Sequence, residues 1–126
     1  MTISSIMTTD QNGSELVNFA KETASILVRN NLTRVQIRNI FTEVRKIEAL
    51  WGSNPTVAMR RLNMLKPKLD YSSARAKPVE GLRDVLTPAI DKVNEATGDE
   101  RDRRFRVFMD LFEAILAYHR SEGGRS

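Results

Sequence analysis

TRVQIRNIFTEVRKIEALW, residues 33–51, carries a clear helical pattern from which the rest of the architecture follows. Its apolar residues recur at steps of three and four, which on a helix of 3.6 residues per turn places them on one stripe. Thr33 is a good N-cap, because its hydroxyl can accept a hydrogen bond from a first-turn N–H. We therefore expect one long amphipathic helix, whose buried stripe consists of Ile37, Ile40, Phe41, Val44, Ile47 and Trp51.

A row of arginines accompanies this stripe. Arg34, Arg38 and Arg45 fall within a narrow arc, with Phe41 between them and the buried face. A guanidinium can bind a phosphate through two parallel hydrogen bonds, so the row suits a polyanion. A solvated helix flank has the same pattern, and this helix taken alone favours that simpler interpretation.

The helical period continues on both sides, in residues 14–29, 55–66, 79–96 and 100–120. Short connections between them favour antiparallel neighbours. No stretch alternates strictly between apolar and polar residues, so no strand is expected. The fold class is therefore all-α, a compact bundle of about five helices with short connections. We expect a single helical domain over residues 14–120, a disordered lead-in at 1–13 and a flexible tail at 121–126.

Two prolines lie within these predicted helical stretches and could interrupt them. Pro67 disfavours a helical conformation at Lys66, so we expect an interruption there, with residues 69–74 forming a separate short turn. Pro88 lies within residues 79–96 and either kinks that helix or begins a new segment capped by Thr87. The apolar period runs through Pro88, which favours a kinked continuous helix.

Composition is that of a soluble globular domain, with 126 residues, 40% apolar and 29% charged. The chain has no cysteine, which excludes disulfides and thiolate chemistry and fits a reducing cytoplasm. No apolar run approaches the length of a membrane span. Net charge is +4, and residues 29–75 hold ten Lys or Arg against three Asp or Glu. A basic middle between near-neutral ends suggests a polyanion-binding surface.

Catalytic patterns are missing from the sequence. His119, the single histidine, falls on the apolar face of the last helix, where a packed or capping role is expected. Asp99, Glu100 and Asp102 fit the N-terminus of that helix better than a metal site. No glycine-rich phosphate loop is present. We expect no cofactor and no metal, and the sequence argues against an enzyme.

A second basic group lies in and after the third helix, where a solvated flank and a binding surface are equally compatible with the pattern. Its members are Arg60, Arg61, Lys66, Lys68 and Arg75. Trp51 and Tyr71 could stack on nucleic-acid bases beside such residues. Both also sit in apolar patterns, which favours the core for each.

Three segments resemble one protein family, the small helical subunit of the CRISPR type III-A Csm effector complex. Residues 32–47, LTRVQIRNIFTEVRKI, resemble its LT-x-x-QIR-x-(F/I)F-x-EVR-x-I segment. Residues 65–75, LKPKLDYSSAR, resemble LKPKLAYAAGR, with departures at Asp70, Ser72 and Ser73. Residues 112–119, FEAILAYH, resemble its FEAI(V/L)AYH ending. The segments occur in the family's order and span most of the chain.

The resemblance implies a non-catalytic five-helix subunit that stacks in several copies beside the other protein subunits. It also implies that the subunit lines the channel holding the guide and target RNA, and touches that RNA through basic residues. The residues that fit this role are Arg34, Arg38, Arg45, Lys66, Lys68, Arg75, Arg60 and Arg61. Gln36 could instead position a neighbouring subunit. Two alternatives stay open: a purely structural spacer contacting proteins, and a free-standing helical nucleic-acid-binding protein.

Overall fold

The expected long helix begins where its cap predicts. The computed structural model describes residues 3–125 and places helix α3 at Arg34–Trp51. Thr33 Oγ1 accepts a hydrogen bond from the Gln36 N–H at 3.1 Å, and Gln36 Oε1 accepts one from the Thr33 N–H at 2.9 Å. This reciprocal capping box satisfies two N–H groups at the start of the helix, and it fixes the point at which α3 begins.

The described residues form helices and no strand, which confirms the all-α prediction. The structure adds one helix at the start to the five expected. The elements in chain order are α1 (Ile3–Thr8), α2 (Ser14–Arg29), α3 (Arg34–Trp51), α4 (Pro55–Arg75), the short 3₁₀ helix η1 (Lys77–Val79), α5 (Glu80–Asn94) and α6 (Gly98–Ser121).

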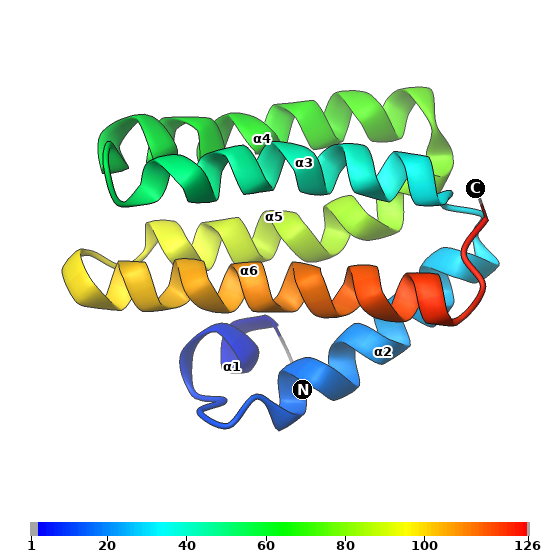
Figure 1. The fold of residues 1–126 in the computed structure, drawn as a ribbon, viewed down its shortest axis with the longest axis horizontal. Coiled ribbons are helices and arrows are strands. Elements are labelled where there is room, and N and C mark those ends of the chain that lie inside the picture. Colours follow the sequence, from blue (N-terminus) through cyan, green and yellow to red (C-terminus); the bar gives the residue numbers. More distant parts are fainter. Residues whose placement is uncertain (1–2, 126) are drawn as a thin grey trace.

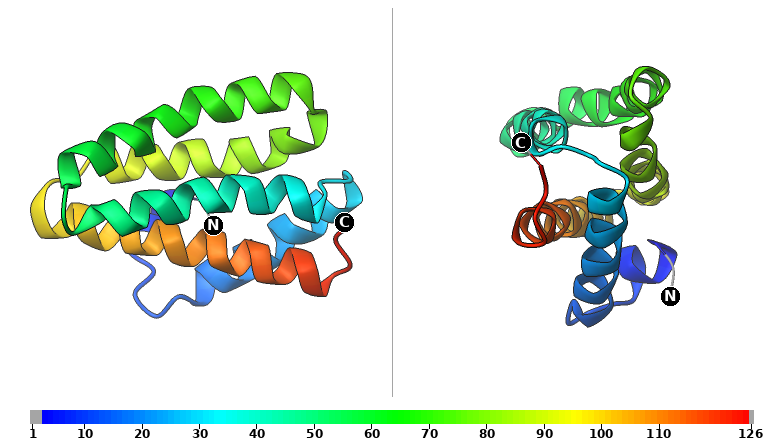
Figure 2. Two further views of the ribbon diagram at one scale, coloured as in Figure 1. Left: turned by 45° about the horizontal axis from the view of Figure 1, so that its top comes forward. Right: turned by 90° about the vertical axis from the view of Figure 1, so that its right-hand side faces the viewer.

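The helices form three tiers. Helices α3 and α4 make one outer tier, α5 and α6 the middle one, and α1 and α2 the other outer one (Figure 1). Helices α3 to α6 run antiparallel to their neighbours and enclose a four-helix arrangement, seen end-on in the right-hand view of Figure 2. The start of α3 therefore lies beside the end of α6.

Helix α6 supplies the centre of the core. Phe108 and Phe112 are fully buried. Phe41 of α3 meets Phe112 edge-on, with ring centroids 5.1 Å apart. Trp51 stacks on Phe105 at 3.8 Å and its Nε1–H donates to Asp102 Oδ1 at 2.9 Å. The prediction that Trp51 packs in the core is therefore confirmed.

Pro67 does not end its helix, so that prediction was wrong. Helix α4 continues through it to Arg75. Leu65 and Leu69, on either side of Pro67, are both buried, whereas Pro67 itself is exposed. Burying two leucines on one stripe outweighs the loss of one backbone hydrogen bond on the solvent side, where water can satisfy the freed carbonyl.

Pro88 also lies inside a continuous helix, α5, as the unbroken apolar period predicted. Leu86, Ala89 and Ile90 around it are buried, and Pro88 points to solvent. Both prolines therefore occupy the exposed side of a helix whose opposite side is held by the core.

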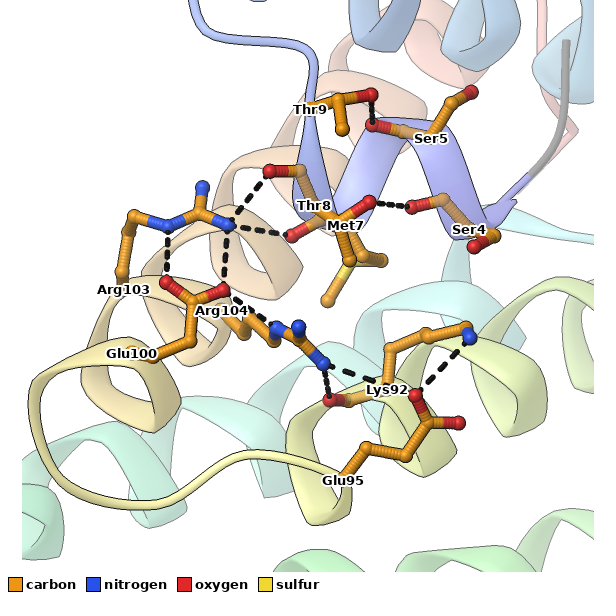
Figure 3. A network of polar contacts seen from close by, with 10 residues as sticks. All are labelled: Ser4, Ser5, Met7, Thr8, Thr9, Lys92, Glu95, Glu100, Arg103 and Arg104. Atoms are coloured by element: carbon orange, nitrogen blue, oxygen red, sulfur yellow. Dashed lines mark hydrogen bonds and ion pairs between the residues drawn. The ribbon is translucent and has the colours of Figure 1, made fainter.

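The expected disorder of the first residues is contradicted over residues 3–13, while residues 1–2 lie outside the described part. Ile6 and Met7 of α1 are fully buried. Arg103 of α6 donates to the main-chain carbonyls of Met7 and Thr8 at 3.1 and 3.0 Å (Figure 3). A guanidinium thus satisfies carbonyls at the end of α1 that no helical N–H reaches, and it ties α1 to the bundle.

The expected flexible tail is likewise held to the bundle up to residue 125. The Gly124 N–H donates to the His119 carbonyl at 2.9 Å, and the Arg125 carbonyl accepts a hydrogen bond from the Arg34 N–H. A side chain at Gly124 would collide with the His119 ring. The turn after α6 therefore requires glycine, and it brings the tail onto the first turn of α3.

The burial of α1 has a consequence for stability. We expect Ile6→Ala to lower the free energy of unfolding by about 2–4 kcal/mol, because it leaves a cavity in the core. The measurement is urea denaturation followed by circular dichroism. Ile26→Ala, at a position 45% exposed on α2, is the control and should change stability by about 0.5 kcal/mol or less. Equal, small effects of the two substitutions would mean that α1 does not pack on the bundle.

The position of Pro67 gives a second expectation. Pro67→Ala should raise the free energy of unfolding by about 1–3 kcal/mol, because alanine restores the N–H donor inside α4. Pro55→Ala is the control, since Pro55 occupies the first turn, where no helical hydrogen bond is lost. Loss of stability in Pro67→Ala would show that the proline ring itself supports the native helix.

Candidate nucleic-acid interface

The predicted basic residues do not lie on one surface. Arg34, Arg38 and Arg45 of α3 face α6. Lys68 of α4 faces α3, and Lys66 faces α5. These predicted residues therefore lie on three different surfaces: the side of α3 next to α6, the side of α4 next to α3, and the side of α4 next to α5.

One groove gathers arginines from two helices. It lies between α3 and α6, has a volume of about 340 Å³, and we name it the α3–α6 groove. Arg34 and Arg38 line it from α3, and Arg120 lines it from α6. Phe41 and Leu116 form part of its apolar floor. Because α3 and α6 are antiparallel, Arg120 lines the same groove as Arg38 and Arg34, which lie 82 and 86 positions earlier in the sequence.

Glu113 also lines this groove, but its carboxylate pairs with Arg45 and not with the groove's own arginines. Within residues 3–125, neither Arg34, Arg38 nor Arg120 forms an ion pair, and the buried Arg34 Nε has no hydrogen-bond partner. A buried guanidinium nitrogen without a partner is costly, and an incoming acceptor would satisfy it. This end of the groove is therefore the most suitable anion site among the predicted residues.

Arg45, further along α3, is in a different environment. Its Nη1 pairs with Glu48 at 3.0 Å and Glu113 at 3.7 Å, and its guanidinium lies 5.7 Å from the centroid of the Phe41 ring. Nearby, burial and, to a lesser extent, the Glu113 carboxylate raise the pKa of Asp110. The charge of Arg45 is thus largely compensated by the chain's own carboxylates.

The two lysines beside Pro67 are also paired. Lys66 Nζ lies 2.6 Å from Asp91 of α5, and Lys68 Nζ lies 3.2 Å from Glu43 of α3. The hydrogen bond from Lys68 is the main cause of the lowered pKa of Glu43. Both pairs are solvent-exposed, and such pairs contribute little to stability. The lysines remain able to exchange partners, but they point to opposite sides of α4.

The other members of the second basic group are on the surface. Arg60 and Arg61 are exposed, and neither has an ion-pair partner in the described part of the chain. Arg75 donates to the Tyr71 hydroxyl at 3.0 Å and lies 5.6 Å from the centroid of its ring. Tyr71 is 63% exposed, so the expectation that it packs in the core was wrong.

Two further arginines are used to hold the fold. Arg103 and Arg104 both bind Glu100, at 2.9 and 2.7 Å, and Arg104 also donates to the Lys92 carbonyl at 2.8 Å (Figure 3). These contacts join α6 to α1 and α5. Glu100 lies in the first turn of α6, as expected for an acidic residue at a helix N-terminus.

His119 has the packed role that its position predicts. It is fully buried, and its Nε2–H donates to the Leu32 carbonyl at 2.7 Å. It joins the end of α6 to the turn that precedes α3. The part of the chain that the structure describes contains no group of three potential metal ligands. None of its helices is both long and apolar enough to cross a membrane.

Arg120 lines the groove but was not among the predicted residues. Its position in the polar arc of α6 gave no reason to join it to Arg34, which is 86 residues earlier. The signals that could have joined them are Gly123 and Gly124, which favour a helix end soon after Arg120, together with an antiparallel arrangement of α3 and α6. That arrangement is a tertiary feature and was not predicted.

The fold and the groove define a small all-helical protein with an arginine-lined surface groove. A scan against protein-family models matches residues 10–125 to the family described as Csm2 Type III-A. The chain therefore belongs to this family, which confirms the resemblance inferred from the three segments. It is accordingly a subunit of the type III-A Csm complex. Neither the curated proteins nor the solved structures contain a match.

The Glu100 cluster makes stability depend on pH. Hydrogen bonds from Arg103, then Arg104, lower the pKa of Glu100 from 4.5 to about 2. Because the pKa is lower in the folded chain, the unfolded chain binds the proton first as pH falls. The contribution of Glu100 to stability is therefore complete above pH 4.5 and is lost as pH falls from 4.5 to about 2.

We expect Glu100→Gln to reduce the slope of unfolding free energy against pH in this window. Urea denaturation at a series of pH values measures the slope. Glu22→Gln, at an exposed position on α2, is the charge-matched control and should leave the slope close to that of the unaltered chain. An unchanged slope in Glu100→Gln would contradict the assigned role.

Proposed function

We propose that this chain is a non-catalytic subunit that binds the backbone of the guide and target RNA through the α3–α6 groove. The observation that carries the proposal is the convergence of Arg34, Arg38 and Arg120 without carboxylate partners. Arg45 extends the row along α3, and its exposed ion pairs with Glu48 and Glu113 can be exchanged for phosphate at little cost.

The chemistry of the groove suits phosphate rather than bases. Guanidinium groups offer paired donors that match phosphate oxygens. Its floor contains Phe41 and Leu116, whereas Trp51 does not line it and instead stacks on Phe105. Base pairing with the guide already supplies sequence specificity in such complexes, so a backbone contact that ignores sequence is sufficient. The subunit would then line the RNA channel and hold the duplex in place.

One copy offers few phosphate contacts. We therefore expect weak RNA binding by the isolated chain, and stronger binding when several copies are held in one complex, because the effective concentration of each groove rises. Stacked copies would place their grooves in succession along the RNA. The second basic group lies on the other side of α3. Its residues would contact RNA only if the RNA wraps around the subunit.

The test is a complex assembled with the triple variant Arg34→Ala, Arg38→Ala, Arg120→Ala. We expect assembly to be retained and target RNA affinity to fall about tenfold or more. The slope of log affinity against log salt should fall by about 2, since each neutralised phosphate of a single strand contributes about 0.7. Filter binding over a salt series measures both quantities.

The control is the triple variant Lys21→Ala, Arg29→Ala, Lys77→Ala, which removes the same charge from exposed positions outside the groove. Its RNA affinity and salt slope should stay close to those of the unaltered complex. Equal losses in the two triple variants would refute a localised site. Failed assembly of the groove variant would favour the structural-spacer alternative, in which these arginines contact acidic protein surfaces.

A further inference from the structure

Helix α4 exposes an ordered row of large apolar side chains. Val57, Met64 and Tyr71 are 37%, 51% and 63% exposed. They are spaced by seven residues, which is close to two helical turns, so they lie in one line along the outside of α4. Isolated exposed apolar residues are ordinary, but an aligned series on a helix is the pattern of a helix–helix contact.

A second row runs beside the first with the same spacing. Arg61, Lys68 and Arg75 are all exposed and also lie seven residues apart. They follow the apolar residues by four positions, so each cation stands one turn beyond its apolar neighbour. We name the two rows together the α4 seam. Basic residues that flank an apolar seam select a partner with acidic residues in the matching positions.

A groove continues the seam toward α3. It has a volume of about 430 Å³, and Met64, Pro67 and Tyr71 line it from α4 while Ile40 lines it from α3. Its polar lining consists of Asn39, Ser72 and the ion-paired Lys68 and Glu43, so an incoming carboxylate would take the place of Glu43 on Lys68. Aliphatic and thioether side chains accommodate other apolar side chains and can repack around them. Two adjacent helices with an apolar groove between them provide the usual seat for a third helix.

These features favour a peptide helix over single-stranded RNA. Sites for unpaired bases use several aromatic platforms, whereas the α4 seam has one aromatic residue, Tyr71, whose ring already has the Arg75 guanidinium over it. Val57 and Met64 offer no stacking surface. An apolar row is also unnecessary for binding a phosphate backbone.

We infer that the α4 seam docks an amphipathic helix of another protein subunit, one that carries acidic residues along the edge of its apolar face. Fourteen residues separate Val57 from Tyr71, and at about 1.5 Å per residue the row is about 21 Å long. The partner helix therefore needs about four turns. Its apolar side chains would lie on Met64 and Tyr71, and its carboxylates would meet Arg61, Lys68 and Arg75.

A second copy of this chain is a poorer occupant. Outside α4, the exposed large apolar residues in the described part of the chain are Val17, Ile26 and Val35. Val17 and Ile26 on α2 are nine residues apart, which is not a spacing that aligns side chains on one helix face as a seam. Val35 is alone on α3. Residues 3–125 thus expose no acidic apolar helix face that would complement their own α4 seam.

The experiment places the photo-reactive amino acid p-benzoylphenylalanine at Tyr71 in cells that express the whole complex. After irradiation, the cross-linked peptides are identified by mass spectrometry. The expected result is a cross-link to a helical segment of another subunit with Asp or Glu at three- or four-residue spacing. Cross-links confined to RNA, to a second copy of this chain or to a segment without acidic residues would overturn the inference, as would their absence.

Two controls make this result specific. The same amino acid at Ile26, a position 45% exposed on α2, should not cross-link to that segment. Met64→Gln in the Tyr71-labelled chain removes an apolar contact without changing charge, and we expect it to reduce the cross-link yield at least fivefold. A yield unaffected by Met64→Gln, or equal labelling from Ile26, would refute docking on the seam. Loss of RNA affinity in the α3–α6 groove variant tests a separate surface.

Discussion

The packing of α3 against the aromatic face of α6 is the constraint on which the rest of the structure depends. Phe41 meets Phe112 edge-on, and ten residues later Trp51 stacks on Phe105. Two contacts at separate points along antiparallel helices fix both the register and the rotation of α3. With that rotation fixed, the arginine row of α3 faces the end of α6 and the tail that follows it. The arginine-lined groove is a consequence of how the aromatic rings pack.

That packing also explains why similar arginines have different roles. Arg103 and Arg104 reach carbonyls at the ends of α1 and α5, and their shared carboxylate Glu100 holds them there. Arg34 and Arg38 share their groove with Leu116 and Ala117 of α6, and the Glu113 carboxylate that also lines it pairs with Arg45 instead. Arg45 lies seven residues further along, opposite Glu113. The sequence of α6 therefore decides which cations of α3 remain available, and that cannot be seen in α3 alone.

The sequence predicted what depends on local rules. The cap at Thr33 and the stripe that includes Trp51 are both encoded within one short stretch of sequence. Predictions failed where a local rule competed with burial, as at Pro67, where Leu65 and Leu69 hold α4 together. Predictions also failed where a residue's neighbour in the fold is far away in the sequence, as Arg120 is from Arg34.

The two ends of the chain were also predicted wrongly, because distant segments determine their structure. Ile6 and Met7 look like part of a polar lead-in until α5 and α6 provide the surface that buries them. The arginine-lined groove needed both the register of α3 and the position of Arg120. Tyr71 was placed in the core because it continues an apolar pattern. The pattern is real, but it belongs to the outer row of α4, and periodicity alone does not say which of two stripes on a helix faces inward.

The two proposed surfaces lie on opposite flanks of α3, and this arrangement has a mechanical meaning. If the subunit binds RNA on one flank and a protein helix on the other, α3 sets the distance between the two. The helix is suited to this, because its core face is pinned by Val44 and Ile47, both buried. The Lys68–Glu43 ion pair crosses from α4 to α3 on the flank proposed to contact protein, and Arg45 pairs with Glu113 on the flank proposed to contact RNA. Each exposed pair could open to an incoming charge at little cost, whereas the buried face of α3 could not shift without breaking its ring contacts. The flanks are therefore adaptable and the spacing between them is fixed, which is the property required of a subunit that sets the distance between an RNA backbone and its protein neighbours.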